Sequence, residues 1–88
     1  MTDKERKAAR LGLDLNDCKI RLLYYLWAAC NGSGFCNVMH SGVCQDRRIL
    51  VAAAELMCDG YIEEDADDGC MFRLTGRGRG LIYSLQAL

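Results

Sequence analysis

The spacing of hydrophobic residues predicts a strongly apolar helix over residues 17–30, DCKIRLLYYLWAAC. The positions that recur at helical spacing on one face are Ile20, Leu23, Tyr24 and Trp27. Leu22, Leu26 and Ala29 widen this face, so the apolar arc covers most of the helix. A helix this apolar must be covered on most sides, either by the rest of the domain or by a second subunit.

A second helix is predicted over residues 45–60, QDRRILVAAAELMCDG. Its apolar face contains Ile49, Ala53, Leu56 and Met57. Gly60 ends the pattern, because glycine is favoured just past a helix end. The residues left facing outward are Arg47, Arg48, Val51 and Glu55.

The pattern changes after Gly60 and predicts a β-hairpin followed by a helix. Residues 61–65 and 70–75 are short strand candidates, and Asp68 and Gly69 between them suit a tight turn. Thr75 can cap a last helix with the sequence GRGRGLIYSLQAL.

Two further segments are predicted, one before helix 17–30 and one between helix 17–30 and helix 45–60. A short charged helix is expected at the start and stops at Gly12, and residues 32–42 predict a loop followed by a weak helical turn. We therefore divide the chain into a charged amino-terminal arm, residues 1–13, and one domain, residues 14–88.

The resulting order of helix, helix, short helix, helix, hairpin and helix is typical of a winged helix-turn-helix. This is a mostly helical α+β fold with a β-hairpin wing and a short terminal helix near the C-terminus. The chain also resembles the MarR and PadR-like winged-helix regulators, which carry L…GYI, a hairpin and then LTxxGxxL. The matching positions are Leu56, Gly60, Tyr61, Ile62, Leu74, Thr75, Gly78 and Leu81. The resemblance covers roughly residues 15–82 and implies a transcriptional regulator of bacterial, archaeal or phage type that binds double-stranded DNA as a dimer.

Composition narrows the class of protein. A chain of 88 residues has room for one domain, and 51% hydrophobic with 26% charged residues favours a folded chain over a disordered one. No apolar run reaches the roughly 20 residues that span a bilayer, and the first ten residues lack the apolar centre of a signal peptide. We therefore expect a cytoplasmic protein.

The same size argument leads to a prediction of self-association. Helix 17–30 supplies more apolar surface than the core of so small a chain is expected to cover. We therefore expect a homodimer through Leu22, Tyr25, Leu26 and Trp27.

Positive charge selects the candidate DNA contacts. In the resemblance, helix 45–60 is the recognition helix, and arginines near its start can contact guanine edges or phosphates. The residues predicted to meet DNA are Arg47, Arg48, Val51, Lys4, Arg6, Lys7, Arg77 and Arg79. Other readings stay open. Arg47 and Arg48 can be a solvated helix start, and the GRGRG segment can form an AT-hook-like or phosphate-binding segment. Alternatively, Arg73, Arg77 and Arg79 can offset the nearby wing acids.

Negative charge favours a different function. Five acidic residues crowd the predicted wing, and they would meet phosphates with like charge. They are Glu63, Glu64, Asp65, Asp67 and Asp68. The alternative hypothesis is therefore a winged-helix adaptor or inhibitor that binds another protein through this acidic wing.

The six cysteines include no CxxC pair, and we expect the thiols to be reduced. Cys30, Cys36, His40 and Cys44 form a possible zinc-binding set, but the spacing C-x5-C-x3-H-x3-C is not a well-known zinc pattern, so no metal or other cofactor is expected. No nucleophile lies in a recognisable catalytic motif, which argues against an enzyme.

Overall fold

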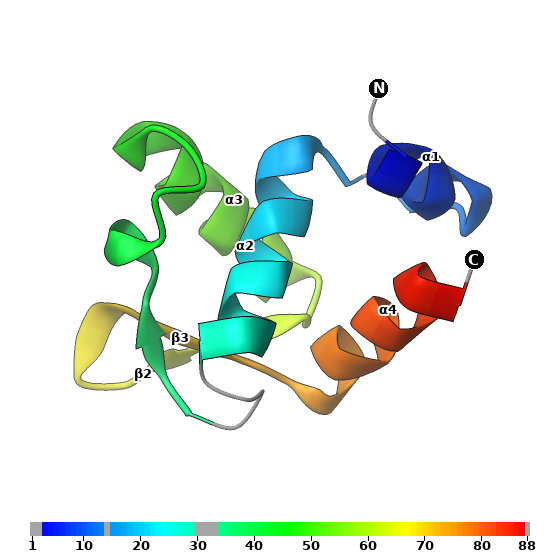
Figure 1. Ribbon diagram of the computed structural model, residues 1–88. Coiled ribbons are helices and arrows are strands. Elements are labelled where there is room, and N and C mark those ends of the chain that lie inside the picture. The colour runs from blue at the N-terminus through cyan, green and yellow to red at the C-terminus, as the bar shows by residue number, and fades with distance from the viewer. Residues whose placement is uncertain (1–2, 14, 30–33, 88) are drawn as a thin grey trace.

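The computed structural model describes residues 3–13, 15–29 and 34–87. In chain order the elements are α1 (Asp3–Arg10), α2 (Asp17–Ala29), β1 (Cys36–Asn37), the 3-10 helix η1 (Val38–His40), α3 (Asp46–Cys58), β2 (Ile62–Asp65), β3 (Asp68–Leu74) and α4 (Gly76–Ala87). This is the predicted mostly helical α+β architecture of a winged helix-turn-helix, with α3 in the position of the recognition helix and β2–β3 as the wing (Figure 1). Among the described residues, no helix combines the length and the hydrophobicity that a membrane span requires.

The sheet has three antiparallel strands in the order β1-β3-β2. Ile62 lies opposite Leu74 at the base of the hairpin, and both side chains are buried, so the base of the wing is fixed to the core. The hairpin turns at residues 66–67, two residues earlier than the predicted turn at Asp68 and Gly69. Asp65 Oδ1 accepts a hydrogen bond from the backbone N–H of Asp67, 3.0 Å away, which is the Asx-type contact that favours a turn at this point.

The segment before α3 contains a strand that the sequence did not predict. Cys36 and Asn37 form β1, which pairs with β3 opposite Phe72 and Met71. The predicted weak helical turn is the 3-10 helix η1, which buries Val38. A strand of two residues is too short for a period-two pattern, so only pairing with β3 defines it.

Helix α2 runs through the middle of the molecule and supplies much of the core (Figure 1). Its buried apolar residues are Cys18, Ile20, Leu22, Leu23 and Leu26. The prediction that Leu22 and Leu26 lie at a dimer interface is therefore wrong, because α3, β3 and α4 of the same chain already pack around α2. Helix α1 packs against α2 and α4 and buries Ala8 in the same core.

The residues that carry the family resemblance meet at one joint between α3, the wing and α4. Gly60 follows α3 with a φ of 81°, a left-handed conformation that glycine adopts without strain. The hydroxyl of Thr75 donates to the Gly60 carbonyl at 2.6 Å and accepts from the Gly78 N–H at 3.1 Å, so Thr75 caps α4. At Gly78 a Cβ atom would stand 2.1 Å from the carbonyl oxygen of Tyr61. The residues of the pattern GYI followed by LTxxG are therefore those that allow α4 to pack closely against the start of the wing.

Candidate nucleic-acid interface

Helix α3 presents one face to the core and the opposite face to solvent. Ile49, Ala52, Ala53 and Leu56 are buried. At 3.6 residues per turn, the positions furthest from these are Arg47, Val51, Ala54 and Cys58, and all four are exposed. The prediction that Arg47, Arg48, Val51 and Glu55 face outward is confirmed.

The two arginines stand in the first turn of α3. Both are exposed, and among the described residues neither forms an ion pair. The thiol of Cys18 donates to the Arg48 carbonyl over 3.7 Å, which ties this turn to α2. Gln45 at the N-cap makes no side-chain hydrogen bond to the helix, so no side chain at that position offsets the positive end of the helix dipole. Asp46 in the same turn offsets one of the two arginine charges, which leaves this end of α3 with a net positive charge.

Apart from Glu55, the rest of the outward face is apolar. Leu50 is 47% exposed and Val51 57% exposed, and Ala54, Met57 and Cys58 continue the face toward the end of the helix. No Asn, Gln, Ser or Thr lies within α3 to read base edges by hydrogen bonding. The helix therefore has the means to meet phosphates or guanines at its start and little to read sequence beyond it.

The other predicted DNA contacts lie apart from this cationic end. Lys4, Arg6 and Lys7 belong to α1, and in Figure 1 α2 stands between α1 and the start of α3. Arg6 is paired with Asp3 at 3.8 Å, and the side chain of Lys4 is outside the described part of the structure.

The GRGRG segment is helical, since residues 76–80 are the opening turns of α4. The guanidinium of Arg77 lies over the ring of Tyr61, 5.1 Å from its centroid, and Arg79 is half-buried. An AT-hook requires an extended chain, so this segment does not have that form.

The wing tip is acidic. Glu64, Asp67 and Asp68 are exposed, whereas Glu63 is half-buried and paired with Arg73 on the neighbouring strand. Through this ion pair Arg73 offsets one wing acid, as expected. The guanidinium of Arg73 also lies over the ring of Phe35, 4.6 Å from its centroid. Asp68 Oδ1 accepts from the Cys70 N–H at 2.9 Å, and the acids therefore also organise the backbone of the hairpin.

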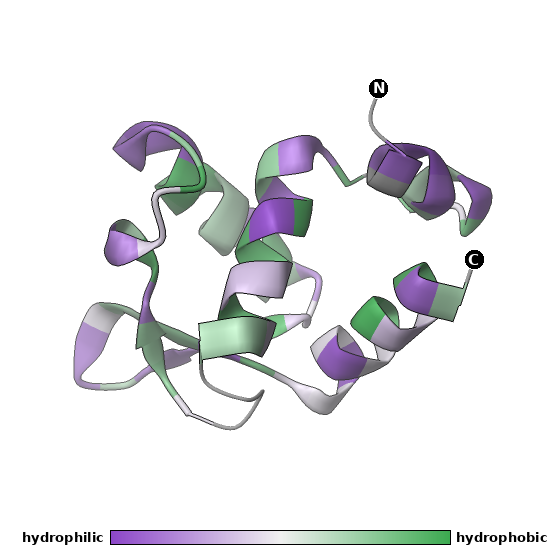
Figure 2. Ribbon diagram, in the orientation of Figure 1, coloured by the Kyte–Doolittle hydropathy of each residue, from purple (hydrophilic) through white to green (hydrophobic). Residues whose placement is uncertain are grey.

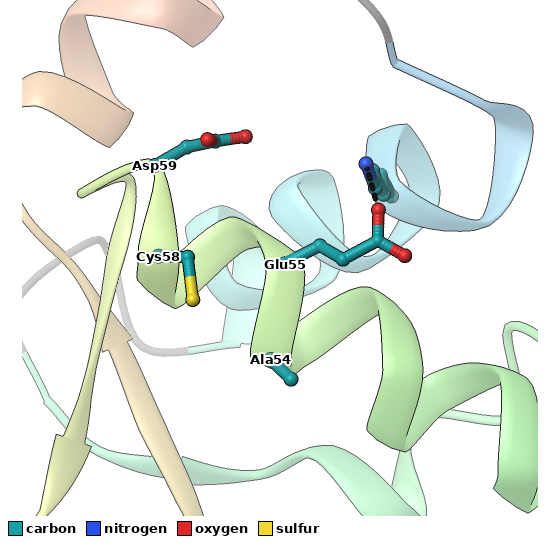
Figure 3. A pocket seen from close by; sticks show the side chains of 5 residues that line it. Ala54, Glu55, Cys58 and Asp59 are labelled. Carbon is teal, nitrogen blue, oxygen red and sulfur yellow. Dashed lines mark ion pairs between the residues drawn. The ribbon is translucent and has the colours of Figure 1, made fainter.

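A pocket of about 410 Å³ lies beside the last turns of α3 (Figure 3). It is lined by Lys19, Ala54, Glu55, Cys58 and Asp59. The Lys19 side chain is only 7% exposed, and its ammonium lies 2.7 Å from a Glu55 carboxylate oxygen. Sequence reasoning missed this pair, because a lysine in an amphipathic pattern gives no sign of being buried. With one lysine and two acids, the pocket lining carries an excess of one negative charge.

The cysteines differ from one another in state. Cys18, Cys44, Cys58 and Cys70 are free thiols, but Cys36 is disulfide-bonded, so the expectation of reduced thiols is wrong for Cys36. A disulfide sulfur is not a thiolate ligand, which removes Cys36 from the zinc set considered above. Cys30 of that set lies outside the described residues.

The Cys18 thiol is buried in the core, and its surroundings raise its pKa. Burial, and then a hydrogen bond with the Cys44 side chain, raise the pKa of Cys18 from its ordinary value of 9.0 to about 12. The neutral thiol is therefore strongly favoured at this position.

Comparison with known proteins gives a likeness of structure. No protein-family model matches the sequence, and no curated protein matches it significantly. Among solved structures, the chain is similar to the crystal structure of a MarR-family transcriptional regulator from Silicibacter pomeroyi, with a TM-score of 0.68 and 22% sequence identity. The match covers 97% of this chain and 60% of that one, so the chain spans a little over half the length of that regulator. The winged helix-turn-helix fold expected from the sequence is thereby confirmed.

Proposed function

We propose that this chain is a winged-helix regulator that binds double-stranded DNA through the start of α3, in a role that involves no catalysis. The observation that carries the proposal is the exposed pair Arg47 and Arg48 in the first turn of the helix that occupies the recognition position. In this fold the start of that helix is the part that approaches base edges and phosphates in the major groove. The structural likeness to a protein described as a transcriptional regulator supports the same reading.

The face around the arginines suggests what kind of DNA binding to expect. Val51 offers only an apolar contact, such as one with a thymine methyl group, and its apolar neighbours add no hydrogen-bonding group. Binding should therefore depend mainly on phosphates and discriminate weakly between sequences.

The test is fluorescence anisotropy of a labelled random-sequence duplex at two salt concentrations. Arg47→Ala and Arg48→Ala should each weaken binding, by about 1 to 3 kcal/mol where the arginine holds a guanine with two hydrogen bonds, and by less where it meets a phosphate. The matched control is Arg10→Ala, which removes an equal charge from an exposed position on α1 and should have the smaller effect.

Substitutions in the wing should have the opposite effect on DNA binding. Replacing Asp65, Asp67 and Asp68 together by Asn should leave DNA binding unchanged or strengthen it, because repulsion from phosphates is relieved. Wild-type protein that shows no salt-sensitive binding to any duplex would refute the proposal.

A second candidate is an adaptor that binds a basic partner protein through the wing. It is favoured by the exposed carboxylates of Glu64, Asp67 and Asp68 at the tip of a hairpin whose base is fixed in the core. In a pull-down, the triple Asn variant should then lose the partner while Arg47→Ala and Arg48→Ala retain it. The reverse pattern would exclude the wing as the binding surface.

A further inference from the structure

The outward face of α3 carries charges of opposite sign at its two ends with apolar residues between them. The start carries Asp46, Arg47 and Arg48, with a net charge of +1, and Glu55 and Asp59 lie near the end. Leu50, Val51 and Ala54 occupy the middle, and all three are exposed. Such a face is complementary to itself when a second copy of the helix runs antiparallel to it.

We propose that two copies of this chain associate through α3, with the helices antiparallel about a two-fold axis near residues 52 and 53. An interface of this kind uses the same patch on both subunits, so each contact occurs twice. The inference goes beyond DNA binding and does not depend on it.

Helix geometry fixes which residues meet. Around a centre between residues 52 and 53, Val51 lies opposite Ala54 of the second copy, and Arg47 lies opposite its Cys58. Because Val51 and Ala54 are small, the two helix backbones can approach closely. The two-fold axis also brings like flanks together, so Leu50 packs beside Met57 of the second copy.

The other flank of α3 brings opposite charges together. It carries Arg48, Glu55 and Asp59, and in the antiparallel arrangement Arg48 stands between the two acids of the second copy. Among the described residues, neither Arg48 nor Asp59 forms an ion pair within its own chain, whereas Glu55 is already paired with Lys19. The new ion pair is therefore Arg48 with Asp59.

The pocket supplies space for these arginines. It lies at the end of α3, holds about 410 Å³, and has Cys58 and Asp59 in its lining with a negative excess (Figure 3). The arginines of the second copy arrive at this same end. The pocket, its negative charge and the exposed apolar residues Leu50, Val51 and Ala54 therefore all fit the same binding partner, which is a second copy of the chain.

This surface is also the one that the proposed DNA contact uses. A dimer of this kind covers Arg47 and Arg48, so self-association and DNA binding exclude one another. The experiment below contains no DNA, and its outcome is therefore independent of whether the chain binds DNA.

Charge reversal with reciprocal rescue tests the geometry. Arg48→Asp and Asp59→Arg each place like charges across the interface twice, and each should weaken self-association by about tenfold or more in sedimentation equilibrium. Both changes suit the helix dipole, with an acid at its start and a base at its end, so both variants should fold. An equimolar mixture of the two variants should associate as well as the wild type, since the mixed dimer keeps one native Arg48–Asp59 ion pair and gains a second one, with reversed charges, between the two substituted positions.

Two further variants keep the test decisive. Ala54→Glu puts a charge at the centre of the interface on an exposed helix position and should abolish association without unfolding the chain. Tyr83→Ser removes an apolar side chain that is exposed on α4, outside the α3 face, and should leave association unchanged. A wild-type chain that stays monomeric up to about one millimolar, a mixture that fails to associate, or a dimer that depends on Tyr83 instead of Ala54 would each overturn the proposal.

Discussion

Gly78 is the residue whose identity the fold constrains most directly. Any Cβ atom at this position would stand 2.1 Å from the Tyr61 carbonyl oxygen, which is backbone and cannot rotate away. Gly78→Ala should therefore lower the free energy of unfolding by about 2 to 3 kcal/mol in urea titration, although alanine is the better helix former. Gly80→Ala is the matched control on the same helix, because nothing lies within 4 Å of its Cβ position, and it should raise stability by up to about 1 kcal/mol. Equal effects at the two glycines would contradict the close approach.

Cys18 should make the stability depend on pH in alkaline solution. Burial raises its pKa in the folded chain from 9.0 to about 12, so the folded state holds the thiol proton more tightly than the unfolded state does. The resulting stabilisation is complete below pH 9 and is lost as the pH rises from 9 to 12. Urea midpoints measured across this range should fall in the wild type and fall less in Cys18→Ala.

Tyr24 acts in the same direction and must be separated from Cys18. Burial raises the pKa of Tyr24 above its ordinary value of 10.0, so its contribution is also lost with rising pH. In a Tyr24→Phe background the difference between Cys18 and Ala at position 18 should persist. Its disappearance there would assign the alkaline slope to the tyrosine.

At the scale of elements, the Lys19–Glu55 ion pair joins α2 to α3. The side chain of Lys19 is buried, whereas that of Glu55 is about half exposed. Glu55→Ala therefore leaves the buried Lys19 ammonium without its partner. We expect Glu55→Ala to cost about 1 to 2 kcal/mol, and Lys19→Met to change stability by less than about 1 kcal/mol, because methionine fills similar space without a charge. Combining the two should recover most of the loss in thermal unfolding. Strict additivity would show that the charges do not interact.

At the scale of the whole molecule, the distribution of positive charge predicts the salt dependence of DNA binding. Among the described residues, Arg47 and Arg48 are the basic residues within the first turn of α3, while the basic residues of α1 lie beyond α2 (Figure 1). Two phosphate contacts give a slope of about −2 in a plot of log K against log salt concentration. Replacing Arg6 and Lys7 by Gln should leave this slope unchanged. A wild-type slope of about −4 that falls in this variant would place α1 on the DNA.

The apolar surface that remains exposed to solvent is unevenly distributed over the molecule. Figure 2 shows apolar ribbon on the inward sides of α2, α3 and α4, and hydrophilic ribbon over much of α1 and the wing. Among the described residues, the large exposed apolar residues are Leu11, Leu50, Val51, Met57 and Tyr83. Three of these five lie on α3, so the apolar surface left to solvent is concentrated on the helix proposed to make contacts.

The helices and the hairpin, in their order along the chain, could be predicted from the sequence alone, whereas β1 could not. The helical spacing in α3, the alternation in β2–β3 and the Thr75 cap are local signals, because each depends on residues a few positions apart. The turn was misplaced by two residues, since several acidic and glycine residues there are all suited to a turn.

What covers each apolar face depends on how the elements pack in three dimensions. Periodicity marks Leu22 and Leu26 as apolar but does not say whether the same chain or a second copy buries them, and α3, β3 and α4 of the same chain do so. In the same way, Lys19 becomes a buried ion pair only because α3 brings Glu55 to it. The pairing of β1 likewise depends on β3, more than thirty residues away. The candidate site follows this division: the outward arginines of α3 were predictable from spacing, whereas the pocket at its far end exists only where α2 and α3 pack together.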